Sequence, residues 1–88
     1  MIKVLKIDDQ TFEVTVEGRT VTTHRVTVEP EVYQRLTGGE VPVEELVEKS
    51  FEFLLQREPN TSILRSFDLQ VIGRYFPEYE STIRTMLT

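Results

Sequence analysis

His24 is the only histidine among the 88 residues, so any mechanism that needs an imidazole base depends on it. A hydrolytic triad requires a histidine within hydrogen-bond reach of a hydroxyl and of an orienting carboxylate. Thr22 lies two residues away, and one possible hairpin register places Glu13 opposite His24. A histidine opposite a glutamate is also an ordinary polar pair on an exposed sheet face. We interpret it in that way and predict no catalytic residue.

Carboxylates are the other candidate ligands, because Glu44, Glu48 and Glu52 recur at intervals of four. This spacing places them in a line along one face of a helix, where they cannot surround a hard cation. The chain has no cysteine for thiolate ligation. Gly38-Gly39 lacks the following Lys-Ser/Thr of a phosphate-binding loop and indicates the end of a helix. We therefore predict neither a metal site nor a cofactor.

The segment 65–79 has the most unusual local composition, with four aromatic residues and two arginines in 15 residues. Aromatic residues and arginine are enriched at the energetic centres of protein interfaces. The candidate partner surface consists of Arg65, Arg74, Tyr75 and Tyr79. The alternative is that the aromatic side chains of this segment belong to the core.

The elements that position these residues begin with strands over residues 1–28. Residues 2–7 are β-prone, and Phe12, Val14 and Val16 then alternate with polar residues, as in a strand with one buried face. A turn at Gly18 and a run rich in Thr and Val over 20–28 complete a predicted three-stranded antiparallel sheet.

The hairpin between the second and third strands has two possible registers. A two-residue loop places Val14 and Val26 on opposite faces of the sheet. A three-residue loop over 17–19 places both valines on one face and exposes Val21. Because a slip of one residue turns every side chain over, we predict a bulge or a twist near 22–24 that reconciles the two patterns.

Residues 29–88 are expected to be helical. Glu29-Pro30-Glu31 begins a short helix that ends at the two glycines. The strongest helix runs from Pro42 to about Glu58, and its apolar residues span roughly 200° of its circumference. Such a helix must be covered by the sheet on one side and by other helices, or a second copy of the chain, on the other.

The last part of the chain is expected to form a short turn that holds Ile63, Leu64 and Phe67, capped by one of the residues 60–62, and two further helices. Asp68 can cap the first of these helices, and Pro77 separates it from the second. Gly73 lies inside the first one and indicates close packing there.

The net charge of −5 comes from residues 29–58, which hold eight glutamates against three basic residues. Both flanking parts are neutral. An acidic chain disfavours broad binding to nucleic acid or to anionic membranes. No apolar run approaches the roughly 20 residues of a membrane span, and no export leader is recognisable, so we expect a cytoplasmic protein.

Residues 24–55 resemble the ribbon-helix-helix DNA-binding family, with a strand over 25–28, a first helix, a Gly turn and a second helix. The resemblance implies a dimer that pairs these strands and presents Arg25 and Thr27 to the bases. Glu44 and Glu45 would stand at the start of the second helix, where they would repel phosphate.

The sequence thus predicts one α+β domain over 1–88, with strands in 1–28 packed on one face against a central helix and two or three carboxy-terminal helices. The expected function is a non-catalytic protein-interaction or regulatory module that binds a partner protein or itself. The alternatives are a ribbon-helix-helix-like dimeric regulator or antitoxin, and a small enzyme.

Overall fold

Residues that favour extended structure form three consecutive antiparallel strands at the start of the chain. The computed structural model describes residues 1–88 and places these strands at Ile2–Lys6 (β1), Thr11–Glu17 (β2) and Val21–Thr27 (β3). In β2 every second residue, from Phe12 to Val16, is fully buried. The predicted alternation is confirmed.

A fourth strand, Ser66–Asp68 (β4), pairs with β3 in parallel. The sheet order is β1-β2-β3-β4, so the sheet is mixed. The α+β class is confirmed, whereas the prediction of a three-stranded, purely antiparallel sheet is wrong. A strand of three residues is too short to show an alternating pattern in the sequence.

The hairpin register differs from both sequence alternatives. Pairing of β2 with β3 runs without interruption and ends with Glu17 opposite Val21, so residues 18–20 form the loop. Val26 lies in the core and Val21 is exposed, as the three-residue alternative expects. The predicted bulge near 22–24 is wrong, because every residue of β3 has one partner on β2.

Two helices follow the sheet, α1 (Pro30–Thr37) and α2 (Val43–Leu55). Gly38 ends α1 with a φ of 73°, and its N–H donates to Gln34 O at 2.9 Å. This left-handed cap is one that a glycine adopts without steric cost. Both helices begin where predicted, and α2 ends slightly earlier than predicted.

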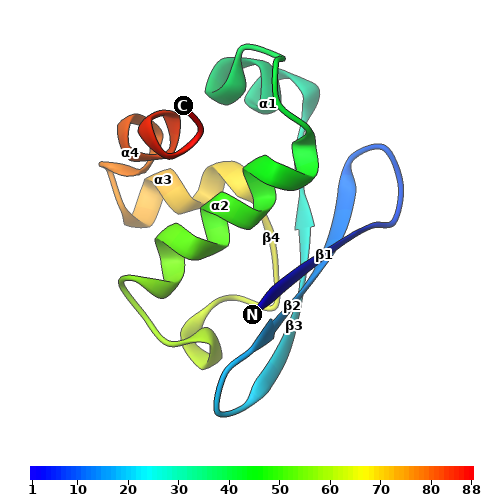
Figure 1. Cartoon of the computed structure of the whole chain (residues 1–88), viewed down its shortest axis with the longest axis vertical. Coiled ribbons are helices and arrows are strands. Elements are labelled where there is room, and N and C mark those ends of the chain that lie inside the picture. Colours follow the sequence, from blue (N-terminus) through cyan, green and yellow to red (C-terminus); the bar gives the residue numbers. More distant parts are fainter.

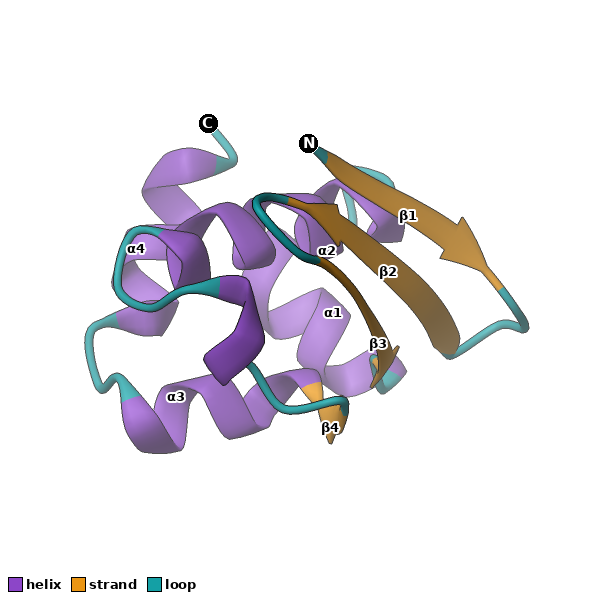
Figure 2. Ribbon diagram, turned by 90° about the horizontal axis from the view of Figure 1, so that it is seen from below, coloured by secondary structure: helices purple, strands orange, loops and turns teal.

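The central position predicted for α2 is confirmed (Figure 1). This helix contacts β1 on one side and both α1 and α4 (Tyr79–Met86) on the other. All helices lie on one side of the sheet, which leaves the opposite sheet face open (Figure 2). The wide apolar arc of α2 is thus covered within a single chain.

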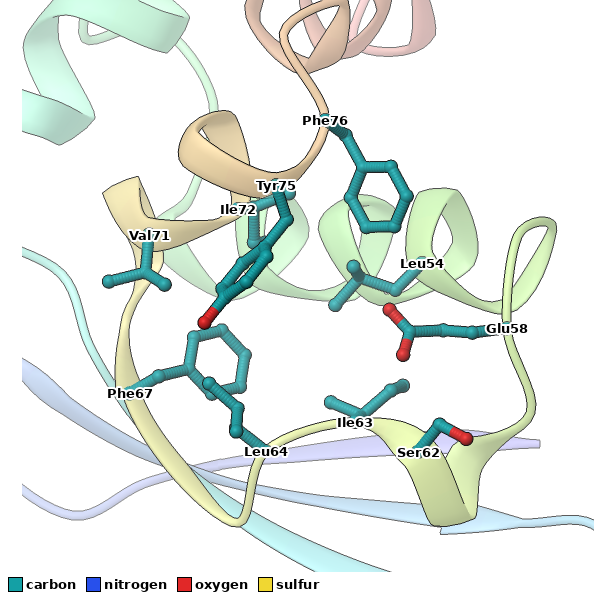
Figure 3. Close-up of a pocket in the computed structure, with 10 residues that line it drawn as sticks. All are labelled: Leu54, Glu58, Ser62, Ile63, Leu64, Phe67, Val71, Ile72, Tyr75 and Phe76. Carbon is teal, nitrogen blue, oxygen red and sulfur yellow. The ribbon is translucent and has the colours of Figure 1, made fainter.

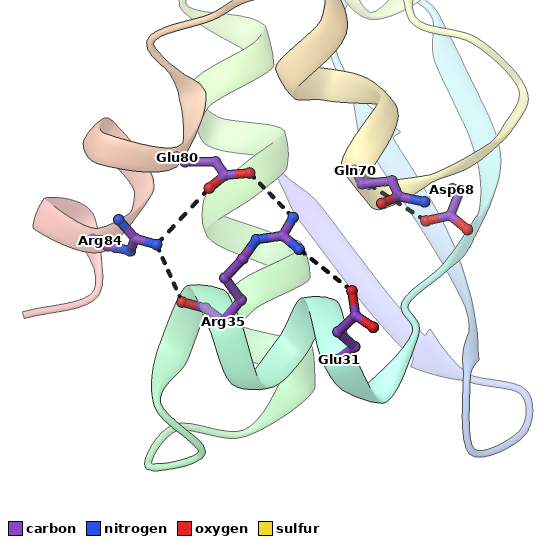
Figure 4. Close-up of polar contacts among 6 residues, drawn as sticks. All are labelled: Glu31, Arg35, Asp68, Gln70, Glu80 and Arg84. Carbon is purple, nitrogen blue, oxygen red and sulfur yellow. Dashed lines mark hydrogen bonds and ion pairs between the residues drawn. The ribbon is translucent and has the colours of Figure 1, made fainter.

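Short elements connect α2 to α4, namely 3₁₀ turns at Asn60–Ser62 (η1) and Leu69–Val71 (η2) and the helix Ile72–Tyr75 (α3). The side chain of Asp68 accepts a hydrogen bond from Gln70 N at 3.4 Å, which confirms Asp68 as a cap (Figure 4). A Cβ atom added at Gly73 would meet no atom within 4 Å. The expectation of close packing at this glycine is therefore wrong.

Charged side chains connect α1 with α4 (Figure 4). Arg35 lies 3.1 Å from Glu80 and 3.8 Å from Glu31, while Arg84 donates to Arg35 O at 3.4 Å. Exposed pairs of this kind contribute about 1 kcal/mol or less each. None of the helices combines the length and the apolarity that crossing a membrane would take.

Candidate functional site

An apolar cleft of about 340 Å³ opens beside the carboxy-terminal end of α2 (Figure 3). Residues between 58 and 76, which follow α2 in the chain, form its other walls. Eight of the ten lining residues are hydrophobic, and the lining consists of Leu54, Glu58, Ser62, Ile63, Leu64, Phe67, Val71, Ile72, Tyr75 and Phe76.

The rim of the cleft exposes two large apolar side chains. Leu64 is 49% exposed and Tyr75 is 67% exposed. Tyr75 is the last residue of α3, and the backbone leaves the helix at Phe76, the residue before Pro77. Proline disfavours helical geometry in the residue before it, so Pro77 fixes where α3 ends and where Tyr75 projects.

His24 supports the loop that carries Leu64. The ring is 2% exposed, with Nδ1 2.8 Å from Leu64 O and Nε2 2.9 Å from Thr22 Oγ1. A carbonyl only accepts, so Nδ1 carries a hydrogen, and in the neutral ring Nε2 then accepts from the Thr22 hydroxyl. The centroid of the His24 ring lies 5.4 Å from that of Phe51. The Phe51 centroid in turn lies 6.0 Å from that of Phe67 in the cleft wall.

The interpretation of His24 as one half of an exposed polar pair with Glu13 is wrong. Its cross-strand partner is Val14 rather than Glu13, and its side chain points into the core rather than to the exposed sheet face. The interpretation depends on the two-residue hairpin register, whereas the observed register places His24 opposite Val14 and on the same face as Val26. His24 does not line the cleft and acts as a structural support beneath it.

Asn60 is the second anchor of the same loop. Its Nδ2 atom lies 2.7 Å from Thr20 O, 3.1 Å from Thr22 Oγ1 and 3.4 Å from Val16 O. The amide thus binds the loop to the end of the β2–β3 hairpin. Thr22 joins the two anchors, because its hydroxyl accepts from Asn60 and donates to His24.

Glu58 is the one charged residue in the lining. Its carboxylate points into the cleft between Leu54 and Ile63 (Figure 3), and no basic side chain forms an ion pair with it. The cleft therefore presents apolar walls and one uncompensated negative charge.

The adjacent Arg57 is engaged elsewhere. Its Nε lies 3.0 Å from Glu78, its Nη1 donates to Phe53 O at 3.1 Å, and its guanidinium stacks 3.6 Å above the Phe53 ring. The pKa of Glu78 is held below its ordinary value by a hydrogen bond from its own backbone N–H and by Arg57. Arg57 thus neutralises Glu78 and leaves Glu58 unpaired.

The partner surface predicted from residues 65–79 is split by the structure. Arg65, Arg74 and Tyr75 are exposed, but Tyr79 is 1% exposed, so its assignment to this surface is wrong. The Tyr79 ring packs 5.2 Å from that of Phe53, and its hydroxyl lies 2.6 Å from Ser50 Oγ. Burial raises the pKa of Tyr79.

Sequence reasoning identified only Tyr75 among the residues that form the rim. Leu54, Ile63 and Leu64 were interpretable only as core residues, because the pattern of apolar residues does not reveal which of them line an opening. The opening arises where the loop 60–65 spans the end of α2, and that crossing is a tertiary feature.

The other candidate sites do not assemble. β4 pairs with residues 25–27 of β3, and Arg25 N donates to Arg65 O at 2.7 Å, so this part of the strand has no free edge for a second ribbon. Arg25 pairs with Glu13 at 3.8 Å on the open sheet face. No three His, Cys, Asp or Glu side chains gather in a way that could hold a metal ion.

Comparison with models of protein families, with curated proteins and with solved structures gives no match for this chain. The geometry of the cleft is therefore the basis for a functional assignment.

Proposed function

We propose that this protein is a non-catalytic interaction module that binds an apolar segment of a partner protein in the cleft beside α2. The observation that carries the proposal is the open apolar cleft with Leu64 and Tyr75 exposed on its rim. Covering such side chains with a partner removes apolar surface from water, at about 1.5–3 kcal/mol for each large side chain that is fully buried.

The chemistry of the rim fits recognition of a protein. Tyrosine offers a large amphipathic surface with few rotatable bonds, and it is enriched where interfaces derive most of their energy. The cleft volume lies at the lower end of the range of about 300–1,000 Å³ for ligand pockets. A short apolar stretch of a partner is thus a better match than a large cofactor.

The loop that forms one wall is already held in place. Hydrogen bonds from His24 and Asn60 fix it to the sheet on its inner side. A wall that is ordered before binding reduces the conformational entropy that association must overcome. This support favours a binding role for the cleft.

The two alternative functions receive less support. A ribbon-helix-helix regulator needs the strand at 25–28 to pair with a second chain, and β4 occupies its outer edge. A small enzyme would have to use groups other than His24, whose ring nitrogens both bond within the core.

Site-specific photo-crosslinking in an extract of the source cells tests the proposal. A photoreactive amino acid at position 75 should give an adduct with one discrete partner protein, and the additional change Leu64→Ala should abolish it. The same group at position 23, on the exposed sheet face, serves as the control and should give no such adduct. Equal adducts from both positions, no adduct from position 75, or persistence in Leu64→Ala would contradict the proposal.

A further inference from the structure

We infer that the segment bound in the cleft carries a basic residue next to its apolar side chains, and that this residue pairs with Glu58. The inference rests on the proposed function and adds the chemistry of the partner. It starts from the one carboxylate that is directed into an otherwise apolar cleft (Figure 3).

The surroundings of Glu58 make its charge available to a ligand. The side chain is half-buried between the apolar side chains of Leu54 and Ile63, and the only other polar side-chain groups in the lining are the hydroxyls of Ser62 and Tyr75. A bound segment would displace water from these walls and reduce the screening of the carboxylate. A neutral or acidic occupant would leave the charge desolvated without a partner, which costs free energy.

The protein has no basic group in position to compensate Glu58. Arg57 is held by Glu78 and by Phe53 O, and neither Arg65 nor Arg74 lines the cleft. Complementarity must therefore come from the occupant. A lysine or arginine can supply it, with the alkyl part of the side chain lying along the apolar wall.

A second copy of this chain is a poor occupant. Two copies that meet cleft to cleft across a two-fold axis would bring their Glu58 side chains toward one another. The chain as a whole carries a net charge of −5, which adds to the repulsion. A partner segment with apolar and basic residues meets neither obstacle.

A displayed library of short random peptides, selected on the immobilised full-length chain, tests the inference without a known partner. Selected peptides should combine large apolar residues with Lys or Arg, and their binding should fall at least tenfold in Leu64→Ala. The tightest such peptide and its versions with Gln or Glu in place of the basic residue then serve as probes.

Binding of these probes to charge variants gives the decisive comparison. Glu58→Gln should weaken the basic peptide by about threefold to tenfold, as expected for a partly exposed ion pair. Glu58→Lys should weaken it further and should restore binding of the Glu-bearing peptide. Glu45→Gln removes an equal charge from an exposed position at the other end of α2 and should leave every affinity unchanged.

The outcomes separate the inference from the proposed function. Peptides that need Leu64 but bind equally well with Lys, Gln or Glu would overturn the inference and leave the proposed function intact. Selection of no peptide that depends on Leu64 would overturn both. Equal losses in Glu58→Gln and Glu45→Gln would also overturn the inference, since the effect would then arise from net charge alone.

Discussion

At the scale of single residues, two buried hydrogen-bonded links connect parts of the molecule that are distant in the sequence. His24 accepts from Thr22 and donates to the backbone of Leu64, which links the sheet to the cleft wall. Ser50 and Tyr79 link α2 to α4 through a second buried hydrogen bond. Every buried side-chain nitrogen and oxygen has a partner, so the loss of either link leaves polar atoms unsatisfied.

Replacing His24 should separate its packing role from its hydrogen bonds. His24→Phe keeps an aromatic ring in the core but leaves Leu64 O without its donor, so the free energy of unfolding should fall by about 1–3 kcal/mol. His24→Ala adds a cavity and should cost more. Chemical denaturation measures both, with the exposed Thr23→Ala as a control that should change stability by about 0.5 kcal/mol or less. A neutral effect of His24→Phe would contradict the assigned hydrogen bonds.

The Ser50–Tyr79 pair should respond asymmetrically to substitution. Ser50 Oγ donates to Leu46 O, so the Tyr79 hydroxyl donates to Ser50. Ser50→Ala leaves this buried hydroxyl without an acceptor and should cost about 1–3 kcal/mol, whereas Tyr79→Phe removes the donor itself and should cost less, near 1 kcal/mol. Equal costs, measured by denaturation of both variants, would contradict this donor assignment.

Alkaline pH provides an independent check on Tyr79. Burial raises its pKa in the folded state, so the folded protein retains the phenolic proton at a pH where the unfolded chain loses it. The contribution of the Tyr79 phenol to the free energy of unfolding is fully present below the ordinary tyrosine pKa near 10. It is lost as the pH rises above that value. Tyr79→Phe should flatten the alkaline side of the stability profile. An unchanged alkaline slope in the variant would show that Tyr79 does not contribute to it.

At the scale of elements, the short strand β4 and the loop before it connect the sheet to the cleft. β4 pairs with β3, and the loop forms one wall of the cleft. β4 pairs with β3 at only three positions, yet its pairing brings Phe67 beside Val26 and the core. The loop is fixed at one end by Asn60 and near the other by His24. The cleft wall therefore depends on a few long-range polar contacts rather than on a regular element.

Removing the Asn60 anchor should loosen this wall. Asn60→Ala should raise amide hydrogen-exchange rates over residues 62–67 more than over α2, because the loop loses its bonds to the β2–β3 hairpin. Thr61→Ala changes an exposed neighbour and should leave the rates unchanged. Uniform acceleration across all elements would indicate a global loss of stability instead of a local anchor.

The ion pair between Arg57, after the end of α2, and Glu78, before the start of α4, should affect the titration of Glu78 at acidic pH. The pKa of Glu78 is lowered by its own backbone N–H and by Arg57, so this carboxylate stabilises the fold above the ordinary glutamate pKa and loses that contribution as pH falls. An NMR titration of Glu78 in Arg57→Ala should show its pKa moving only part of the way back to the ordinary value, because the backbone hydrogen bond remains. A complete return, or no change, would contradict the two causes.

The periodic elements could be predicted from sequence, and the cleft could not. β2 and α2 follow from alternation and from a 3.6-residue apolar repeat, and the ends of α1 follow from Pro30 and Gly38. The side chains of His24 and Tyr79 were misplaced because their environment depends on hairpin register and on helix packing. Register and helix packing depend on contacts between residues far apart in the sequence. The same holds for β4 and the loop before it, which are positioned by contacts with β3.

At the scale of the whole molecule, helices cover one sheet face and the other face remains open (Figure 2). Large apolar side chains are exposed in two parts of the molecule. Leu64 and Tyr75 lie at the cleft, and the others belong to the segment 1–21, namely Met1, Leu5, Ile7 and Val21. Only the first group adjoins an apolar cleft. Glu58 is one of the glutamates in residues 29–58 that give the chain its negative charge, and it lines the cleft.

The location of a bound ligand tests most directly the claim that the cleft beside α2 is a binding site. We would titrate the isotope-labelled chain with the tightest selected peptide and follow every backbone amide by NMR. The account predicts shifts concentrated at the end of α2 and over residues 62–76, with loss of these shifts in Leu64→Ala. Shifts centred on the open sheet face around Leu5 and Val21, with the cleft amides unchanged, would contradict it.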